Sequence, residues 1–288
     1  MGTVDELIRQ LQKGKPQARA DAAEKLGELG DQRAVPVLVE TLMSDANPRV
    51  RAEAAYALGE LRNPETVDAL IEALQKDRNP QVHRAAAAAL GSIKDPKAVK
   101  PLSRALLKNK SKSVRIVAAN SLREIGDPES AEPLIHALQN DKETEVRRAA
   151  AHALITVNDS RAIHPLIKAL QEEDSFLRQY AATALGALRA SEATDALISI
   201  LDHDGDKNVR AAAAEALGKI GDPKAVPALA VALGNSNWEV RKAARESLQR
   251  FTLTHPDAIL LISPDDRHRL GRLVQDAQRD ELSQEICK

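Results

Sequence analysis

The sequence predicts an all-α protein, a right-handed α-α superhelix of about eight helical hairpins with a helical cap at the C-terminus. One observation is a repeat of 31 or 32 residues, anchored on the dipeptide Val-Arg or a close variant of it. A second is that Ala follows each anchor by three residues and Leu by seven. A third is the low aromatic content of 2%, which requires a core of small aliphatic side chains. The anchors are Arg19, Arg51, His83, Arg115, Arg147, Arg178, Arg210 and Arg241.

The first helix of each hairpin begins with a cap and a proline. In Asp95-Pro96-Lys97-Ala98, Asp can cap the helix and Pro suits its first position. A second proline follows a few residues later, where it should remove a backbone hydrogen bond and bend the helix. This second proline occurs at Pro36, Pro101, Pro133, Pro165 and Pro227.

The second helix starts near the anchor and ends at Gly-Asp, as in Gly30-Asp31, where Gly suits a left-handed C-terminal cap. Counting the anchor as position 0, positions −1, +3, +4, +7 and +10 share one apolar face and form the predicted core. Positions +1, +2, +5 and +9 lie opposite and vary. The small residues of Ala-Ala-x-Ala-Leu-Gly should let neighbouring helices approach closely. A lone hairpin cannot bury its apolar stripe, so the units must stack.

The repeats account for residues 1–252, and residues 253–288 depart from the pattern. Ser263-Pro264-Asp265-Asp266 is typical of a helix start, and Leu270, Leu273 and Val274 share one face after it. We expect residues 253–288 to form capping helices over the last repeat, followed by a polar tail.

These residues carry a resemblance to HEAT repeats. Asp lies six positions before the anchor, as in Asp45 and Arg51, and the first helix contains the recurrent proline. The version D-P-x-A-V-x-P-L…V-R-x-x-A-A-x-A-L-G resembles the short HEAT-like repeats of phycobilisome bilin lyases. The resemblance implies a solenoid in which these Asp and Arg residues form a ladder. The ladder should be interrupted where the repeat departs from this pattern, at His83, Asn109, Glu172 and Asn235.

Composition argues against several classes of function. The formal net charge of −1 gives no cationic excess for a nucleic-acid backbone. One cysteine allows no internal disulfide and no thiolate zinc site. No stretch approaches the roughly 20 apolar residues of a membrane span, and the N-terminus does not resemble a signal peptide. We therefore expect a cytoplasmic protein with no nucleic-acid partner and no membrane insertion.

The sequence points to no metal site and no cofactor. Deoxyhypusine hydroxylase is a HEAT-repeat enzyme that binds two irons through His-Glu pairs near the start of second helices. The matching positions here, such as Ala52-Glu53 and Arg84-Ala85, contain no such pair. The segment from Asp202 to Asn208 is superficially similar to a calcium loop but lacks its Gly and Glu. We expect it to be a turn capped by Asp206.

Variable residues of the second helices form the predicted partner-binding surface, which we place on the concave side. Tyr and Arg are enriched at interface hot spots, and apolar residues stand out where other copies are small or polar. The alternative is neutral drift of surface residues. The candidate residues are Tyr56, Arg84, Ile116, Asn120, Arg148, His152, Gln179 and Tyr180.

The function predicted from the sequence is a non-enzymatic scaffold that binds another protein on its concave face. The resemblance implies an alternative, a phycobilisome-related factor that is either a bilin lyase subunit, active as part of a complex, or a protein that binds phycobiliproteins. A third possibility is an enzyme with an unrecognised site. No dedicated lyase motif maps onto this chain, so no catalytic residue is assigned.

Overall fold

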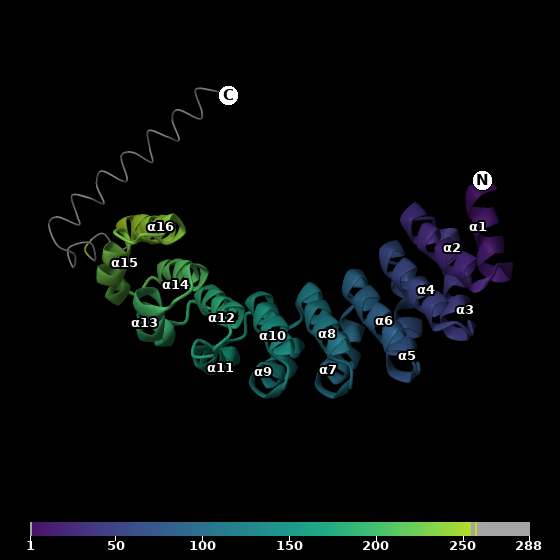
Figure 1. Ribbon diagram of the computed structural model, residues 1–288, viewed down its shortest axis with the longest axis horizontal. Helices are drawn as coiled ribbons and strands as arrows, with labels where there is room; N and C mark the ends of the chain where they lie inside the picture. Colours follow the sequence, from purple (N-terminus) through teal and green to yellow (C-terminus); the bar gives the residue numbers. More distant parts are fainter. Residues whose placement is uncertain (1, 255–256, 258–288) are drawn as a thin grey trace, which may run out of the picture. The chain divides into compact units, whose positions relative to one another are not determined.

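The computed structural model describes residues 2–254 and residue 257, and Figure 1 shows their arrangement. These residues form sixteen α-helices and seven short 3-10 helices, without a strand among them, so the all-α prediction is confirmed. The chain divides into two compact units, Met1–Val157 (unit 1) and Asn158–Lys288 (unit 2).

Unit 1 consists of two layers of helices, visible in Figure 1 as a lower and an upper row. Each second helix packs on the first helix that precedes it and on the second helices of adjacent repeats. The first helices are α1 (Gly2–Lys13), α3 (Val35–Ser44), α5 (Val67–Lys76), α7 (Val99–Lys108) and α9 (Ala131–Asn140). The second helices are α2 (Pro16–Leu29), α4 (Pro48–Leu61), α6 (Pro80–Ile93), α8 (Lys112–Ile125) and α10 (Thr144–Val157).

Unit 2 repeats the same hairpin three times within its described residues. The second helices α12, α14 and α16 pack in that order, and each contacts the first helix before it. The first helices are α11 (Ile163–Ala169), α13 (Thr194–His203) and α15 (Val226–Ala232), and the second helices are α12 (Ser175–Ala187), α14 (Lys207–Ile220) and α16 (Trp238–Thr254).

A 3-10 turn precedes each first helix from α3 onward. In η3 (Pro96–Ala98), the Asp95 carboxylate accepts a hydrogen bond of 2.8 Å from the amide of Lys97, which confirms the predicted cap. Because the α-helix starts only after this turn, Pro36 falls in the first turn of α3. No intrahelical donor is needed there. The prediction of a proline-induced bend within a helix was therefore wrong. The other 3-10 turns are η1 (Gln32–Ala34), η2 (Pro64–Thr66), η4 (Pro128–Ser130), η5 (Ser160–Ala162), η6 (Ser191–Ala193) and η7 (Pro223–Ala225).

Second helices end as predicted where Gly follows them. Gly30, Gly126 and Gly221 have φ of 68°, 69° and 78°, in the left-handed region that Gly enters freely. Arg62 and Lys94 adopt the same conformation at other repeats, at φ of 49° and 62°. A glycine is therefore favoured at this cap but not required.

The predicted core face is confirmed in the second helices. Positions −1, +3, +4, +7 and +10 are buried in α4, and the same pattern recurs in α14 at all but its last residue. The α4 residues are Val50, Ala54, Ala55, Leu58 and Leu61.

The predicted C-terminal cap lies outside the described residues, apart from Leu253, Thr254 and Asp257. Helix α16 continues to Thr254, two residues beyond the predicted end of the repeats at residue 252. Phe251 is buried near its end.

Candidate protein-binding surface

Glycines set the spacing of the second helices. A methyl group on Gly59 of α4 would lie 2.7 Å from the Cα atom of Ala89 on α6. A methyl group on Gly91 of α6 would lie 2.9 Å from the Cα atom of Ser121 on α8. The Ser121 hydroxyl donates a hydrogen bond of 2.8 Å to the Ala87 carbonyl across the same contact. These close approaches confirm the predicted role of the small residues and hold the helices side by side.

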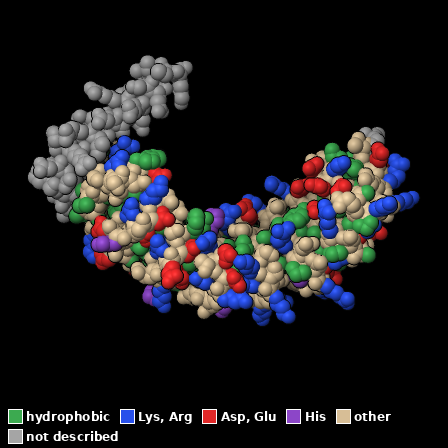
Figure 2. Space-filling view, in the orientation of Figure 1, with side chains coloured by type: hydrophobic (Ala, Val, Ile, Leu, Met, Phe, Trp, Pro, Cys, Tyr) green, Lys and Arg blue, Asp and Glu red, His purple; other side chains and the backbone are tan. Residues whose placement is uncertain are grey.

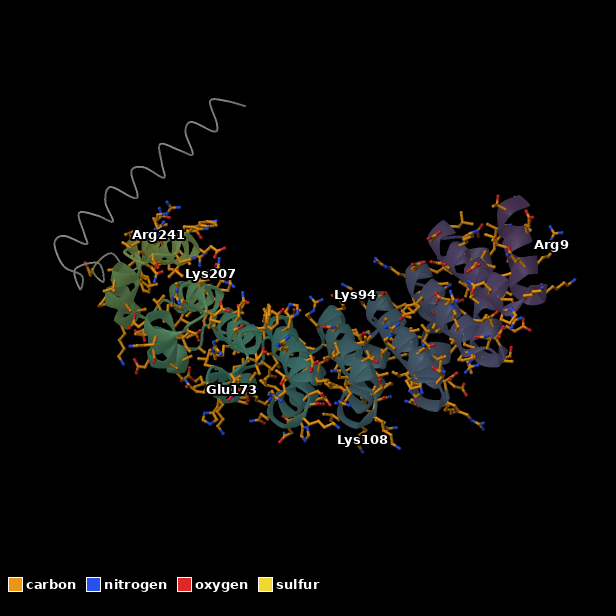
Figure 3. All side chains as sticks on the ribbon, viewed as in Figure 1. Arg9, Lys94, Lys108, Glu173, Lys207 and Arg241 are labelled. Carbon is orange, nitrogen blue, oxygen red and sulfur yellow. The ribbon has the colours of Figure 1, made fainter. Side chains whose placement is uncertain are left out.

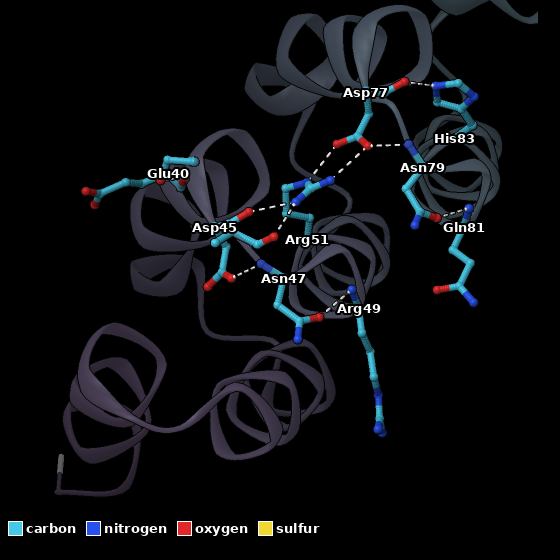
Figure 4. A network of polar contacts seen from close by, with 11 residues as sticks. Glu40, Asp45, Asn47, Arg49, Arg51, Asp77, Asn79, Gln81 and His83 are labelled. Atoms are coloured by element: carbon cyan, nitrogen blue, oxygen red, sulfur yellow. Dashed lines mark hydrogen bonds and ion pairs between the residues drawn. The ribbon is translucent and has the colours of Figure 1, made fainter.

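An arginine–aspartate ladder links successive repeats (Figure 4). Arg51 donates from Nε and Nη2 to the two carboxylate oxygens of Asp77 of the next repeat, at 2.7 and 2.9 Å. Its Nη1 donates to the backbone carbonyl of Asp45 in its own repeat, at 2.7 Å. The same bidentate pairing joins Arg19 to Asp45, Arg115 to Asp141 and Arg178 to Asp204, which confirms the ladder implied by the resemblance.

The ladder favours ionised aspartates. Burial opposes the ionisation of Asp77, but the hydrogen bonds from Arg51 and from the Asn79 amide together outweigh it, so the pKa of Asp77 is lowered. The pKa values of Asp45, Asp141 and Asp204 are lowered in the same way.

One rung of the ladder has a histidine and an asparagine in place of the arginine and the aspartate. The His83 ring lies with Nε2 2.6 Å from the Asp77 carbonyl and Nδ1 3.2 Å from the Asn109 amide nitrogen. If Nε2 carries the proton, Asn109 donates to Nδ1. The ladder of arginine–aspartate ion pairs is therefore interrupted at His83 and Asn109, as expected, and a hydrogen-bond contact between these two side chains takes the place of the ion pair.

The interruption expected at Asn235 is confirmed. Asn235 accepts a hydrogen bond from the amide of Asn237. The Nε atom of Arg210, on the preceding repeat, is buried and has no partner in the described part of the chain. The interruption expected at Glu172 concerns two different units and stays a prediction.

Six of the eight candidate residues lie on successive second helices of unit 1. Arg84, Ile116 and Arg148 occupy position +1, and Tyr56, Asn120 and His152 occupy position +5. We call these six residues the α4–α10 surface. All are half-buried except Arg84, which is exposed. The other two candidates, Gln179 and Tyr180, are half-buried on α12 in unit 2.

The expected accessibility of positions +1 and +2 was wrong for small residues. Ala20 and Ala52 at position +1 are 1% and 5% exposed, and Ala85 and Ala149 at position +2 are also buried. These positions face the adjacent second helix, which a helical wheel of a single repeat does not include. Long side chains extend beyond the contact, so Arg84 and Ile116 reach the surface where alanine does not.

Acidic side chains gather over α2 and α4 in Figure 2. Burial, together with Glu28 and Glu24 of α2, raises the pKa of Glu60. Burial and then Glu24 raise the pKa of Glu53, while Arg84 opposes this shift. Glu53 was missing from the sequence-based candidates. Comparing position +2 of α4 with position +5 of α2 could have found it.

His152 lies in a different electrostatic environment. Burial and the charge of Arg123 lower the pKa of its imidazole, and the charge of Glu124 opposes them. His152 on α10 therefore tends to be neutral beside the charged residues of α8.

Unit 2 contains a cleft that none of the candidate residues lines. Its volume is about 610 Å³, and it lies at the C-terminal ends of α12, α14 and α16. Arg189, Lys219 and Arg250 line it together with Gly186 and Gly218. Cations at helix C-termini also complement the helix dipoles, which accounts for their position without a ligand.

Residues 2–254 contain no group of three or more His, Cys, Asp and Glu side chains placed to hold a metal ion. Asp206 caps α14 by accepting from the Asn208 amide at 2.8 Å, as predicted for the turn that is similar to a calcium loop. In the described part of the chain, none of the helices combines the length and apolarity that a membrane span needs.

Known proteins share parts of this sequence and its fold. Phycocyanobilin lyase subunit alpha of Nostoc sp. strain PCC 7120 is 44% identical over 84 residues, which are 26% of this chain and 30% of that protein. The subunit of the same name from Microchaete diplosiphon is 47% identical over 79 residues, 25% of this chain and 27% of that protein. The chain thus matches less than a third of the length of each relative. These matches confirm the resemblance to bilin lyase repeats.

The likeness of fold extends further along the chain. The X-ray structure of YibA from E. coli has 26% identity and a TM-score of 0.64, and the alignment covers 85% of this chain and 92% of that one. A family model described as HEAT repeats matches residues 4–78, 67–155, 131–216 and 194–286. With its stacked hairpins and its arginine–aspartate ladder, the chain therefore belongs to the HEAT-repeat family.

Proposed function

We propose that this protein is a non-catalytic scaffold that binds a protein partner on the α4–α10 surface. The observation that carries this proposal is the exposure of Arg84 and the partial exposure of Ile116 on adjacent helices, at a position where alanine is buried in other repeats. Tyr and Arg are enriched at interface hot spots, and this surface contains the exposed Arg84 and the half-buried Tyr56.

The charges around the α4–α10 surface indicate which charge a partner should carry. Its N-terminal end is acidic, and burial followed by repulsion from the glutamates of α2 raises the pKa values of Glu53 and Glu60. A partner that brings a Lys or Arg side chain to Tyr56 would relieve this repulsion and could also contact the aromatic ring. A concave shape for this surface remains part of the proposal.

A second candidate function is supported by the matches of 44% and 47% to phycocyanobilin lyase subunits alpha. In this case the protein would act in a bilin lyase complex or bind a phycobiliprotein. Purified phycocyanin serves as the first probe of binding. Mixing the protein with apo-phycocyanin, a bilin and a candidate second subunit tests the lyase activity, which would appear as bilin absorbance that persists on the denatured phycocyanin.

Variants of the α4–α10 surface test the scaffold. The pair Arg84→Asp and Ile116→Asp should weaken the partner's affinity at least tenfold, because an unpaired carboxylate buried in an interface is costly. The matched control is Met43→Asp with Arg78→Asp, an apolar and a cationic residue that are exposed elsewhere in unit 1. The partner is phycocyanin if it binds, and otherwise the protein that crosslinks to the scaffold in its source cells.

The outcomes separate the two candidates. Equal affinities of the surface pair and the control pair would contradict the proposed surface. Bilin attachment that depends on this chain would replace the non-catalytic scaffold by the lyase. Thermal unfolding of each variant shows whether a loss of binding reflects a loss of fold.

A further inference from the structure

Helix α7 presents an unbroken row of cations to solvent. Lys100, Arg104 and Lys108 follow one another at intervals of four residues and are all exposed, and Lys97 precedes them on η3. In the part of the chain that the structure describes, none of the four side chains makes an ion pair or hydrogen bond. Like charges at this spacing repel one another. Figure 2 shows blue side chains over the lower edge of α7, and Figure 3 shows Lys108 at its outer end.

The neighbouring first helices do not share this composition. Helix α5 carries Asp68 and Glu72, and Lys76 is paired with Glu72 at 2.9 Å. Helix α9 carries Glu132 and no lysine or arginine. The row of cations is therefore a local feature of α7 and not a property of the repeat.

A cleft of about 200 Å³ lies at the C-terminal end of this row. It is formed by α5, α6 and α7, and Arg104 and Lys108 provide its two cations. Its polar lining also includes Gln75, His83 and Asn109. Both side chains of the His83–Asn109 rung therefore line this cleft.

No carboxylate of the described residues lines this cleft, because an asparagine stands where other rungs have an aspartate. At the other rungs described for unit 1, an aspartate occupies the place of Asn109, and an arginine occupies the place of His83. An aspartate at position 109 would bring a carboxylate to the wall of the cleft, beside Arg104 and Lys108. Asn109 keeps the hydrogen bond to the Ser111 amide, at 2.9 Å, without that charge.

From the row of cations and the cleft that carries two cations and no carboxylate, we infer that α7 is a docking site for an acidic segment of a partner protein. One carboxylate of the segment enters the cleft at Arg104 and Lys108, and further carboxylates lie along Lys100 and Lys97. This site lies on the layer of first helices, whereas the α4–α10 surface belongs to the layer of second helices (Figure 1). It does not depend on the function proposed above.

An acidic protein segment fits this site better than a nucleic acid. Leu107 is 39% exposed beside the cations and offers an apolar contact that side chains of a protein can use. Neither η3 nor α7 contains an aromatic residue on which a base could stack. The ten residues of α7 span about 15 Å, which matches two to three turns of a helical peptide.

The test measures binding of a fluorescein-labelled octaglutamate peptide to the full chain at low ionic strength. Arg104→Gln with Lys108→Gln should weaken the affinity at least tenfold. Its matched control, Lys13→Gln with Lys25→Gln, removes two exposed lysines elsewhere in unit 1 and should change the affinity less than twofold. Asn109→Asp should also weaken it, by about tenfold, whereas Asn208→Asp adds the same charge in unit 2 and should not.

Thermal unfolding of Asn109→Asp and of the Arg104→Gln and Lys108→Gln pair separates a loss of binding from a loss of stability, and Arg104 and Lys108 are exposed. If a site variant and its matched control weakened the binding equally, the binding would be due to diffuse electrostatic attraction, and the proposed site would be wrong. Absence of peptide binding at millimolar concentration would overturn it too. The assignment to a protein partner would be overturned if an eight-nucleotide single-stranded DNA bound more tightly than the peptide and its binding were weakened equally by the same substitutions.

Discussion

Each ladder arginine connects two repeats at once. Arg51 binds the carboxylate of Asp77 in the next repeat and the backbone carbonyl of Asp45 in its own. Asp77 in turn accepts from the Asn79 amide, which starts the next second helix. A single side chain therefore couples the turn within one repeat to the turn of its neighbour.

Replacing Arg51 by Ala should lower the free energy of unfolding by about 2 kcal/mol. Asp77 would keep its largely buried charge but lose its counter-ion, and removing one partner of such a pair costs more than the pair contributes. Urea denaturation followed by circular dichroism measures the change. Arg49→Ala is the control, because Arg49 is exposed and, within the described residues, its guanidinium donates a hydrogen bond to Gln17 alone. An effect no larger than that of the control would contradict the structural role of the ladder.

Acid should weaken the fold through the same aspartates. Their pKa values are lower in the folded protein than in the unfolded chain, where the pKa of Asp is about 4. The stability that they contribute is fully present above the unfolded pKa and is lost as the pH falls through the folded pKa. Denaturation midpoints measured from about pH 6 to about pH 2 should fall in the wild type, and fall less in Asp77→Asn. A fall of equal size in both proteins would contradict this assignment.

His83 and Asn109 should behave as a coupled pair. His83→Arg with Asn109→Asp restores the ion pair of the other rungs, whereas each single change leaves a mismatched rung. We expect a favourable coupling of about 1–2 kcal/mol in a double-mutant cycle, since the two side chains are in contact. If the two single substitutions had additive effects on the free energy of unfolding in urea, the contact between His83 and Asn109 would contribute no coupling to stability.

At the scale of the helix, close approach depends on the absence of a side chain. Gly59 faces Ala89 at a distance that leaves no room for a methyl group, and Gly27, Gly186 and Gly218 face the next helix in the same way. Each contact joins consecutive second helices of one unit. Glycine at this place therefore serves helix packing and not a turn.

Gly59→Ala should destabilise the protein by about 1–3 kcal/mol, because the added methyl group would lie 2.7 Å from backbone that cannot easily move. Gly205→Ala is the control. A methyl group there would meet nothing within 4 Å, and the residue has no positive φ. Thermal unfolding of both variants compares them, and equal melting temperatures would contradict the packing argument.

At the scale of the whole molecule, stability is distributed along the repeats. The helix contacts join neighbours in sequence, as α4 with α6 and α14 with α16. In such arrays each repeat is stabilised mainly by the repeats beside it. A local defect should therefore remain local.

Gly59→Ala should accelerate amide hydrogen exchange in α4 and α6 and leave α14 unchanged. The reason is that the Gly59 contact lies within unit 1 whereas α14 belongs to unit 2, and local opening follows the local stability. Hydrogen exchange followed by mass spectrometry distinguishes the segments. Uniform acceleration from α2 to α16 would show a single cooperative unit instead.

The sequence alone was sufficient to predict the hairpins, their caps and the core face. These features repeat every 31 or 32 residues and depend on contacts within one hairpin, so a pattern such as Asp95-Pro96 or the left-handed Gly30 is visible in one copy. The ladder followed from the resemblance, because Asp45 and Arg51 stand at the spacing that HEAT repeats use.

The accessibility of the surface could not be obtained in this way. Ala52 is buried and Arg84 is exposed at the same position of the repeat, because the neighbouring helix covers the backbone but not the end of a long side chain. His83 and Asn109 lie 26 residues apart and were taken as two separate defects, yet they meet across a repeat boundary. Contacts between different repeats decide these features, and a pattern within one repeat contains no information about them.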